Sequence, residues 1–173
     1  MTRPLAILAL ALAGMLTATG AAGASHQGSG GGPRDFAVGT FTTGDMQGSF
    51  AAHGGPSPFE PVSGHFLAKG EVVDTGPPDK GPTAFRFAGP VTCLNVQGNR
   101  AGLIYPIEKA DPETFEGQAV LIFLEDNGKP SGGDSPDRVG FVGPAPISAL
   151  PACTPGPTPF DADKGNVTIH EGS

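Results

Sequence analysis

The chain has 173 residues, a length that suits one domain with a single core. Its 28 Gly and 19 Pro are the residue types least compatible with helices, which argues against a helical bundle. The net charge of −7 argues against nucleic acid or an anionic membrane as a partner. With no Trp, one Tyr and 11 Phe, the aromatic side chains suit packing better than recognition of sugars or bases.

The first 24 residues have the three parts of a secretory signal peptide. Arg3 supplies the positive start, residues 5–16 are apolar, and residues 22–24 read Ala-Gly-Ala, a cleavage site. We expect cleavage between Ala24 and Ser25. The apolar run is shorter than the roughly 20 residues that a membrane-spanning helix needs. The sequence therefore predicts a secreted, extracellular product without membrane attachment after cleavage, and a single-pass anchor is the alternative.

Both cysteines, Cys93 and Cys153, lie in the part expected to be exported, where the surroundings are oxidising. We expect a disulfide between them, and two unrelated buried thiols are the alternative. In the chain-entropy model, closing a loop of this size stabilises the fold by roughly 4 kcal/mol.

After a Gly-rich leader at 25–34, residues 35–173 are expected to form a single β domain. Short runs alternate apolar and polar residues and are separated by Gly, Pro, Asn and Asp, as in half-buried antiparallel strands. The eight strands predicted from this pattern are 36–42, 47–53, 64–73, 83–87, 91–96, 101–107, 118–125 and 138–142, and a last run at 166–170 is expected to pair back onto the sheet.

Four connections have distinct local signals. Residues 97–100, Gln-Gly-Asn-Arg, predict a tight hairpin, because Gly and Asn tolerate positive φ. Residues 111–115 predict one helical turn, with Asp111 as the capping residue. Residues 125–137 are typical of a long exposed loop, in which any local function would lie. Residues 143–159 hold six Pro, so this segment is expected to be extended and held by the disulfide rather than to join a central strand.

These elements predict an all-β fold: a single antiparallel β-sandwich or a small closed β-barrel of about eight strands with one disulfide. The pattern does not distinguish the two. The segments VTCLNVQGNRA at 91–101 and EDNG at 125–128, with PDR at 136–138, resemble a family of small exported bacterial β-proteins. That family has no agreed catalytic residues, so the resemblance implies fold and export only.

The chain offers little metal-binding chemistry. Its four His, at positions 26, 53, 65 and 170, lack the close spacing of zinc ligands. For His26, near the new N-terminus, we favour a disordered leader, and a copper or nickel site is the alternative. Asp126, Asn127, Asp134 and Asp137 supply oxygen atoms of the kind that calcium uses, but their spacing matches no EF-hand. We favour turn formation for these residues and expect no metal or other cofactor.

No catalytic constellation is visible. No Ser lies in G-x-S-x-G, and both Cys are assigned to the disulfide. Glu125 and Asp126 are adjacent on a strand and point to opposite faces, so they would not flank one substrate bond.

We therefore expect a non-catalytic, monomeric secreted domain that binds through its surface or loops, with a protein or the cell wall as partner. The first alternative is a small barrel that encloses an apolar ligand between Phe side chains, and a hydrolytic enzyme is the second.

Overall fold

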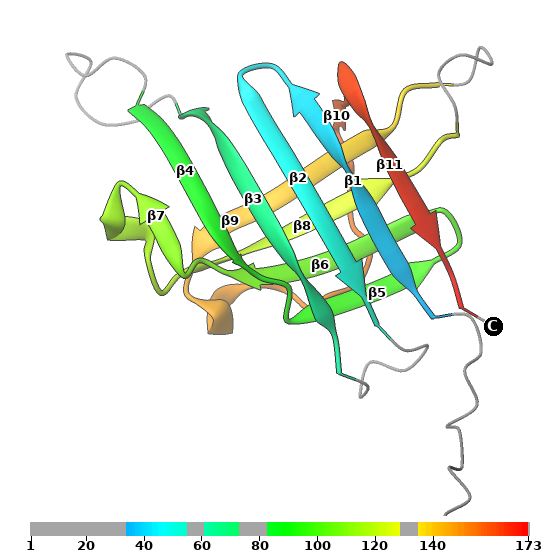
Figure 1. Ribbon diagram of the computed structural model, residues 1–173, viewed down its shortest axis with the longest axis horizontal. Coiled ribbons are helices and arrows are strands. Elements are labelled where there is room, and N and C mark those ends of the chain that lie inside the picture. The colour runs from blue at the N-terminus through cyan, green and yellow to red at the C-terminus, as the bar shows by residue number, and fades with distance from the viewer. Residues whose placement is uncertain (1–33, 55–60, 73–82, 129–134, 173) are drawn as a thin grey trace, which may run out of the picture. The chain divides into compact units, whose positions relative to one another are not determined.

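The computed structural model describes residues 34–54, 61–72, 83–128 and 135–172. Gly31–Ser173 is one compact unit, and its described residues form two antiparallel sheets packed face to face (Figure 1). The predicted signal peptide, the cleavage site at Ala24–Ser25, the leader up to residue 33 and residues 129–134 lie outside the described residues.

Sheet A has the strand order β11-β1-β2-β3-β4-β7 and sheet B the order β10-β9-β8-β6-β5. The strands of sheet A are β1 (Phe36–Thr43), β2 (Met46–His53), β3 (Ser63–Val72), β4 (Thr83–Pro90), β7 (Lys109–Asp111) and β11 (Lys164–His170). Those of sheet B are β5 (Cys93–Gln97), β6 (Arg100–Pro106), β8 (Ala119–Glu125), β9 (Arg138–Ala145) and β10 (Phe160–Asp161). Two short 3₁₀ helices, η1 (Glu113–Phe115) and η3 (Ile147–Ala149), complete the fold.

The all-β prediction is confirmed, and the choice that the sequence left open is resolved as a sandwich. All eight predicted strands and the last run at 166–170 are present, with ends displaced by a few residues. The hairpin at 97–100 is also confirmed, because Gln97 pairs with Arg100 and Gly98 has a φ of 63°. Two very short strands, β7 and β10, were not predicted, because two or three residues carry no readable alternation.

The predicted helical turn forms as η1, but its predicted cap was wrong. Asp111 ends β7, Pro112 occupies the capping position, and no side chain caps the first turn. The first residues of the Pro-rich segment also differ from expectation, because β9 continues to Ala145. Pro144 is accommodated there since β10 pairs only with Arg138 and Val139, which leaves the rest of β9 as a sheet edge.

The core lies between the sheets and is rich in aromatic rings. Phe50 and Phe66 of sheet A stack with ring centroids 6.1 Å apart, and Phe66 stacks on Tyr105 of sheet B at 4.3 Å. These side chains come from alternate positions of their strands, as one-sided burial of a sheet requires. The two sheets therefore share one apolar interior.

Sheet B is covered on its outer face as well. Every residue of β8 from Ala119 to Leu124 is buried, because the segment 150–159 crosses that face. We call this segment the strap. The predicted disulfide between Cys93 and Cys153 is present and fastens the strap to β5, with the Cα atoms 6.3 Å apart. Gly102 and Gly140 leave room for the strap, since a Cβ on either would collide with its backbone.

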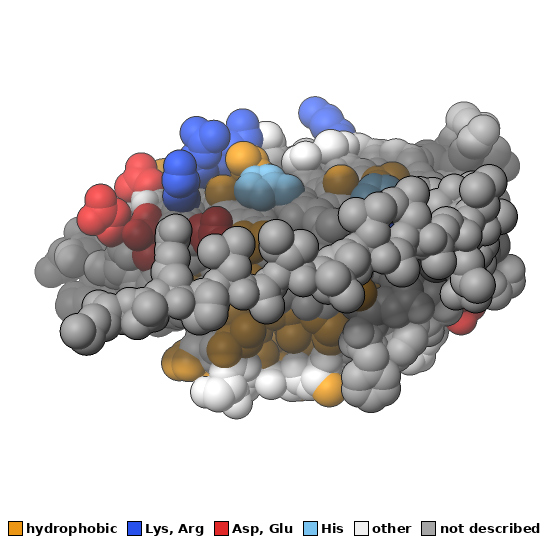
Figure 2. Space-filling view, turned by 60° about the horizontal axis from the view of Figure 1, so that its bottom comes forward, with side chains coloured by type: hydrophobic (Ala, Val, Ile, Leu, Met, Phe, Trp, Pro, Cys, Tyr) orange, Lys and Arg blue, Asp and Glu red, His pale blue; other side chains and the backbone are white. Residues whose placement is uncertain are grey.

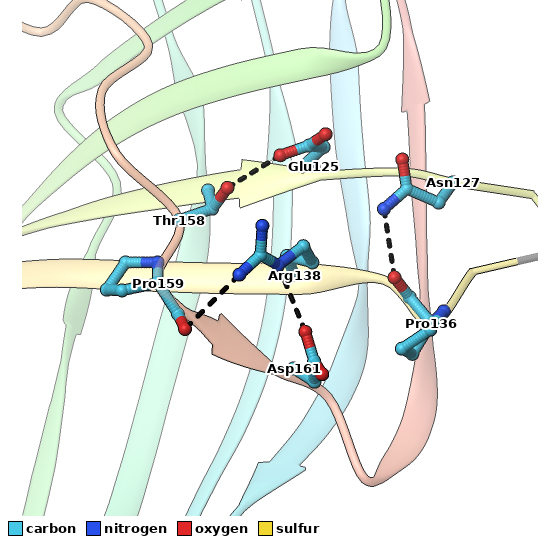
Figure 3. Close-up of polar contacts among 7 residues, drawn as sticks. All are labelled: Glu125, Asn127, Pro136, Arg138, Thr158, Pro159 and Asp161. Atoms are coloured by element: carbon cyan, nitrogen blue, oxygen red, sulfur yellow. Dashed lines mark hydrogen bonds and ion pairs between the residues drawn. The ribbon is translucent and has the colours of Figure 1, made fainter.

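Polar contacts hold the far end of the strap to β8 and β9 (Figure 3). The Thr158 hydroxyl donates to the Glu125 carboxylate at 2.6 Å. Arg138 donates to the carbonyl oxygen of Pro159 at 3.3 Å and forms an ion pair with Asp161 at 3.0 Å. The strap is thus fixed at both ends, by a covalent bond at one and by Arg138 at the other.

Two aspartates of the β8–β9 connection, one next to the end of each strand, close the free edge of sheet A. β11 pairs with β1 on one side, so the N–H groups of Val167 and Ile169 on the other side lack strand partners. The Asp137 carboxylate accepts from Val167 N–H at 2.7 Å, and the Asp126 carboxylate accepts from Ile169 N–H at 3.0 Å. Asp137 is 3% exposed. Such charge-assisted bonds protect the strand edge and join the two sheets.

Replacing Cys93 or Cys153 with Ser should lower the free energy of unfolding by roughly 2–5 kcal/mol, because the strap loses its covalent anchor. Equilibrium denaturation in guanidinium chloride measures the change. An unchanged midpoint would contradict the structural role of the bond.

Replacing Asp137 with Ala should destabilise the protein by about 1.5–3 kcal/mol, because the buried Val167 N–H loses a charged acceptor. Hydrogen exchange at Val167 should also become faster. The matched control is Glu108→Ala, because Glu108 is exposed, and we expect a change within about 0.5 kcal/mol. Equal effects of the two substitutions would show that the edge contact contributes nothing particular.

Candidate functional site

A cavity of about 380 Å³ opens between the two sheets. It lies below the β1–β2 hairpin, against the part of β9 that β10 leaves unpaired. We call it the cleft. Its lining is mostly apolar and aromatic, from both sheets: Phe41, Met46, Phe66, Ala68, Phe85, Phe87, Tyr105, Val120, Ile122, Phe141, Pro144 and Phe160, with Thr43, Gly44, Asp45, Glu71 and Gly143.

The floor of the cleft is rigid core. Phe41 and Phe66 are at most 2% exposed, and Tyr105 is 1% exposed. Burial raises the pKa of the Tyr105 phenol far above its ordinary value of 10.0, because the surroundings disfavour the phenolate. The floor is therefore a preformed apolar surface with one neutral phenol in it.

The mouth of the cleft carries two exposed aromatic rings. Phe141 of β9 and Phe160 of β10 are 40% and 43% exposed, and they stack with ring centroids 5.4 Å apart. Arg138 positions Phe160, because it binds the residues on either side of it, Pro159 and Asp161 (Figure 3). This exposed pair continues the apolar lining out to solvent.

The polar part of the lining is acidic. Asp45 in the β1–β2 turn and Glu71 of β3 are exposed and contribute to the lining. The turn itself is fixed, because Gly44 adopts a left-handed φ of 53° and its N–H donates to the Asp163 carboxylate at 3.1 Å. A molecule in the cleft would therefore meet rings below it and carboxylates beside it.

Two of the residues predicted as weak calcium ligands, Asp126 and Asp137, bind neighbouring N–H groups at the edge of β11. Asp126 and Asp137 accept backbone N–H groups of Gly128, Asn127 and β11. Asp134 lies outside the described residues. In residues 34–54, 61–72, 83–128 and 135–172, no three His, Cys, Asp or Glu side chains are placed to hold a metal ion.

The three described His lie away from the cleft. His53, His65 and His170 are exposed on the outer face of sheet A, and His26 lies outside the described residues. Phe36 stands between two of them, with its ring 5.2 Å from that of His170 and 6.1 Å from that of His53. Neither His53 nor His65 lines the cleft.

The sequence predicted that Phe side chains of the central strands could surround a ligand, but it did not predict the two rings at the mouth of the cleft. Phe141 falls on the inward face of β9 by its alternation with Val139, so its strand carried a signal. Phe160 carried none, because β10 is two residues long and follows a Pro-rich segment. The sequence also treated the loop at 125–137 as the place for function, whereas Asp126 and Asp137 in it support β11.

No protein-family model matches the chain, and neither a curated protein nor a solved structure is significantly similar to it. None of the helices in the described residues has the length and hydrophobicity that crossing a bilayer requires.

The buried phenol makes stability depend on pH in the alkaline range. The pKa of Tyr105 is higher in the folded state than in the unfolded state. The free energy of unfolding is therefore unaffected by this group below about pH 10 and falls as the pH rises further, because only the unfolded state then loses the phenol proton readily. Because Tyr105 is the sole Tyr, phenolate absorbance reports it directly. We expect this absorbance to appear together with loss of circular dichroism. Titration with a midpoint near 10 in a fully folded protein would contradict the burial.

Proposed function

We propose that the protein is a non-catalytic binding domain that acts outside the cell and holds a small apolar molecule in the cleft. The observation that carries this proposal is the cavity of about 380 Å³ with its aromatic lining. Ligand sites typically measure about 300–1,000 Å³ and are mostly apolar with a few polar groups. The sequence analysis proposed an apolar ligand inside a closed barrel as an alternative. We keep the apolar ligand, and the cleft of the sandwich takes the place of the barrel interior.

The exposed pair at the mouth supports this function energetically. Leaving Phe141 and Phe160 two-fifths exposed forgoes burial free energy of about 25 cal/mol per Å² of apolar surface. A bound apolar molecule would cover both rings and recover that free energy. In a chain with few large apolar residues, two rings left at a cavity mouth favour a binding role over packing alone.

The composition of the lining favours binding over catalysis. Among the described residues that line the cleft there is no His, Cys or Ser, and its two carboxylates, Asp45 and Glu71, are exposed to solvent at its edge. Tyr105 is a poor proton donor there, because burial raises the pKa of its phenol above the ordinary value of 10.0. The cleft is therefore suited to hold a molecule rather than to transform it.

The polar edge restricts the kind of molecule. Asp45 and Glu71 would repel an anionic end group and would attract a cationic or hydrogen-bond-donating one. We propose an apolar body with a neutral or positively charged polar end as the ligand class. The disulfide supports the extracellular location, because such bonds persist in oxidising compartments.

The neutral dye N-phenyl-1-naphthylamine should bind with a 1:1 stoichiometry, and its fluorescence should rise on binding. Phe141→Ser and Phe160→Ser should each weaken binding about tenfold, because each removes roughly 1–2 kcal/mol of apolar contact. The matched control is Ile147→Ser, since Ile147 is 55% exposed and does not line the cleft. Its affinity should stay within twofold of the parent protein.

A second variant tests the interior of the cleft. Ala68 is buried in the lining, so Ala68→Phe should fill the cavity and abolish dye binding. A thermal melt of the same variant shows whether the fold is retained. Absence of dye binding to the parent protein, or equal binding by the folded Ala68→Phe variant, would refute the proposal.

A further inference from the structure

The outer face of sheet A concentrates the basic residues of an acidic protein. Four of the seven described Lys and Arg project from it: Lys69, Arg86, Lys109 and Lys164. All three described His lie on the same face, and Figure 2 shows Lys, Arg and His side chains along one side of the molecule. We call this surface the basic face. It stands out because the whole chain has a net charge of −7.

The strand register places three of these basic residues in one row that crosses all six strands. Neighbours in the row are cross-strand partners in successive pairs: Lys164, Thr42, Gln47, Lys69, Arg86 and Asp111. Adjacent strands lie about 4.8 Å apart, so the row extends for about 24 Å. Two shallow depressions of about 460 and 330 Å³ follow this row and share Gln47 and Lys69.

The central pair of the row costs stability. Lys69 and Arg86 face each other directly on β3 and β4, and like charges in this position destabilise a sheet. Glu71 projects from the same face and Asp111 is the register partner of Arg86, yet neither carboxylate forms an ion pair with a described cation. The cations on the basic face are thus unpaired by described carboxylates, which favours an external anionic partner.

The side chains between the cations indicate the chemistry of that partner. Hydroxyl and amide groups fill the row and the next one, where Asn166, Thr40 and Ser49 are register partners. These groups hydrogen-bond well to sugar hydroxyls. The aromatic ring on this face, Phe36, is half-buried and already stacked on His170, so the face offers no platform for bases.

We propose that the basic face binds an anionic polysaccharide, with its chain lying along the row from Lys164 to Arg86. The flat course of the row and its strand-to-strand spacing, comparable with one sugar unit of an extended glycan, suit a linear polymer. Carboxylates of the polymer pair with Lys69 and Arg86, while Thr42 and Gln47 bind its hydroxyls. This site is separate from the cleft and independent of the ligand proposed there.

The test uses the folded, disulfide-bonded protein and polygalacturonate, a linear polyuronate, with neutral dextran of similar length as a control. We expect binding to polygalacturonate, none to dextran, and a loss of about tenfold in affinity when the NaCl concentration is raised fourfold. Lys69→Gln and Arg86→Gln should each weaken binding about fivefold and together at least tenfold. The charge-retaining Lys69→Arg/Arg86→Lys variant should bind within about threefold of the parent protein.

A control variant distinguishes the loss of a charge on the basic face from a change in the net charge of the whole protein. Ser148→Glu in η3 lowers the net charge by the same amount as Lys69→Gln but lies on the side of sheet B, so it should leave the affinity within twofold. No binding to polygalacturonate, or equal binding by the Lys69→Gln/Arg86→Gln variant, would overturn the proposal. Tighter binding to duplex DNA or to anionic vesicles at equal charge concentration would also overturn it, because the face would then serve another class of partner.

Discussion

The stack of Phe66 on Tyr105 joins the two sheets, and the rest of the interior is arranged around it. Its ring centroids are 4.3 Å apart, and both side chains are at most 1% exposed. Core residues that lie away from the cleft are mainly Ala, Val and Leu, which allow close approach of the backbones. At the cleft, the lining is largely aromatic, and the flat rings leave space between them. A composition with few large aliphatic side chains therefore yields one tightly packed end and one open end.

The fold was largely predictable because its strands alternate cleanly. Phe50 and Ala52 on β2, or Phe85 and Phe87 on β4, follow the period of two that marks one-sided burial. The choice of a sandwich was not readable, because it depends on how strands pair across long distances. The cleft was only partly predictable, since its mouth depends on Phe160 in a two-residue strand. The basic face could not be predicted from the sequence. The net charge is a sum over the whole chain, and only the strand register of sheet A shows that basic residues gather on one face.

The two outer faces of the sandwich differ in their exposure to solvent. The strap covers sheet B, so β8 is buried on both sides and sheet B behaves as the middle layer of three. Sheet A has no such cover among the described residues, and its outer face is polar and basic. The disulfide thereby does more than stabilise, because it determines which face of the molecule meets solvent. Two features therefore stay accessible to solvent. The polar row lies on the outer face of sheet A, and the cleft opens at the edge between the two sheets.

The pairing of β1 with β11 also constrains the order in which the chain folds. Phe36 and His170 are register partners although 134 residues separate them in the sequence. During synthesis β1 leaves the ribosome long before β11 exists, so the edge of sheet A stays open while the intervening strands emerge. Asp126 and Asp137 cannot cap β11 until that strand has docked. Sheet A therefore cannot reach its native pairing until β11 has been synthesised.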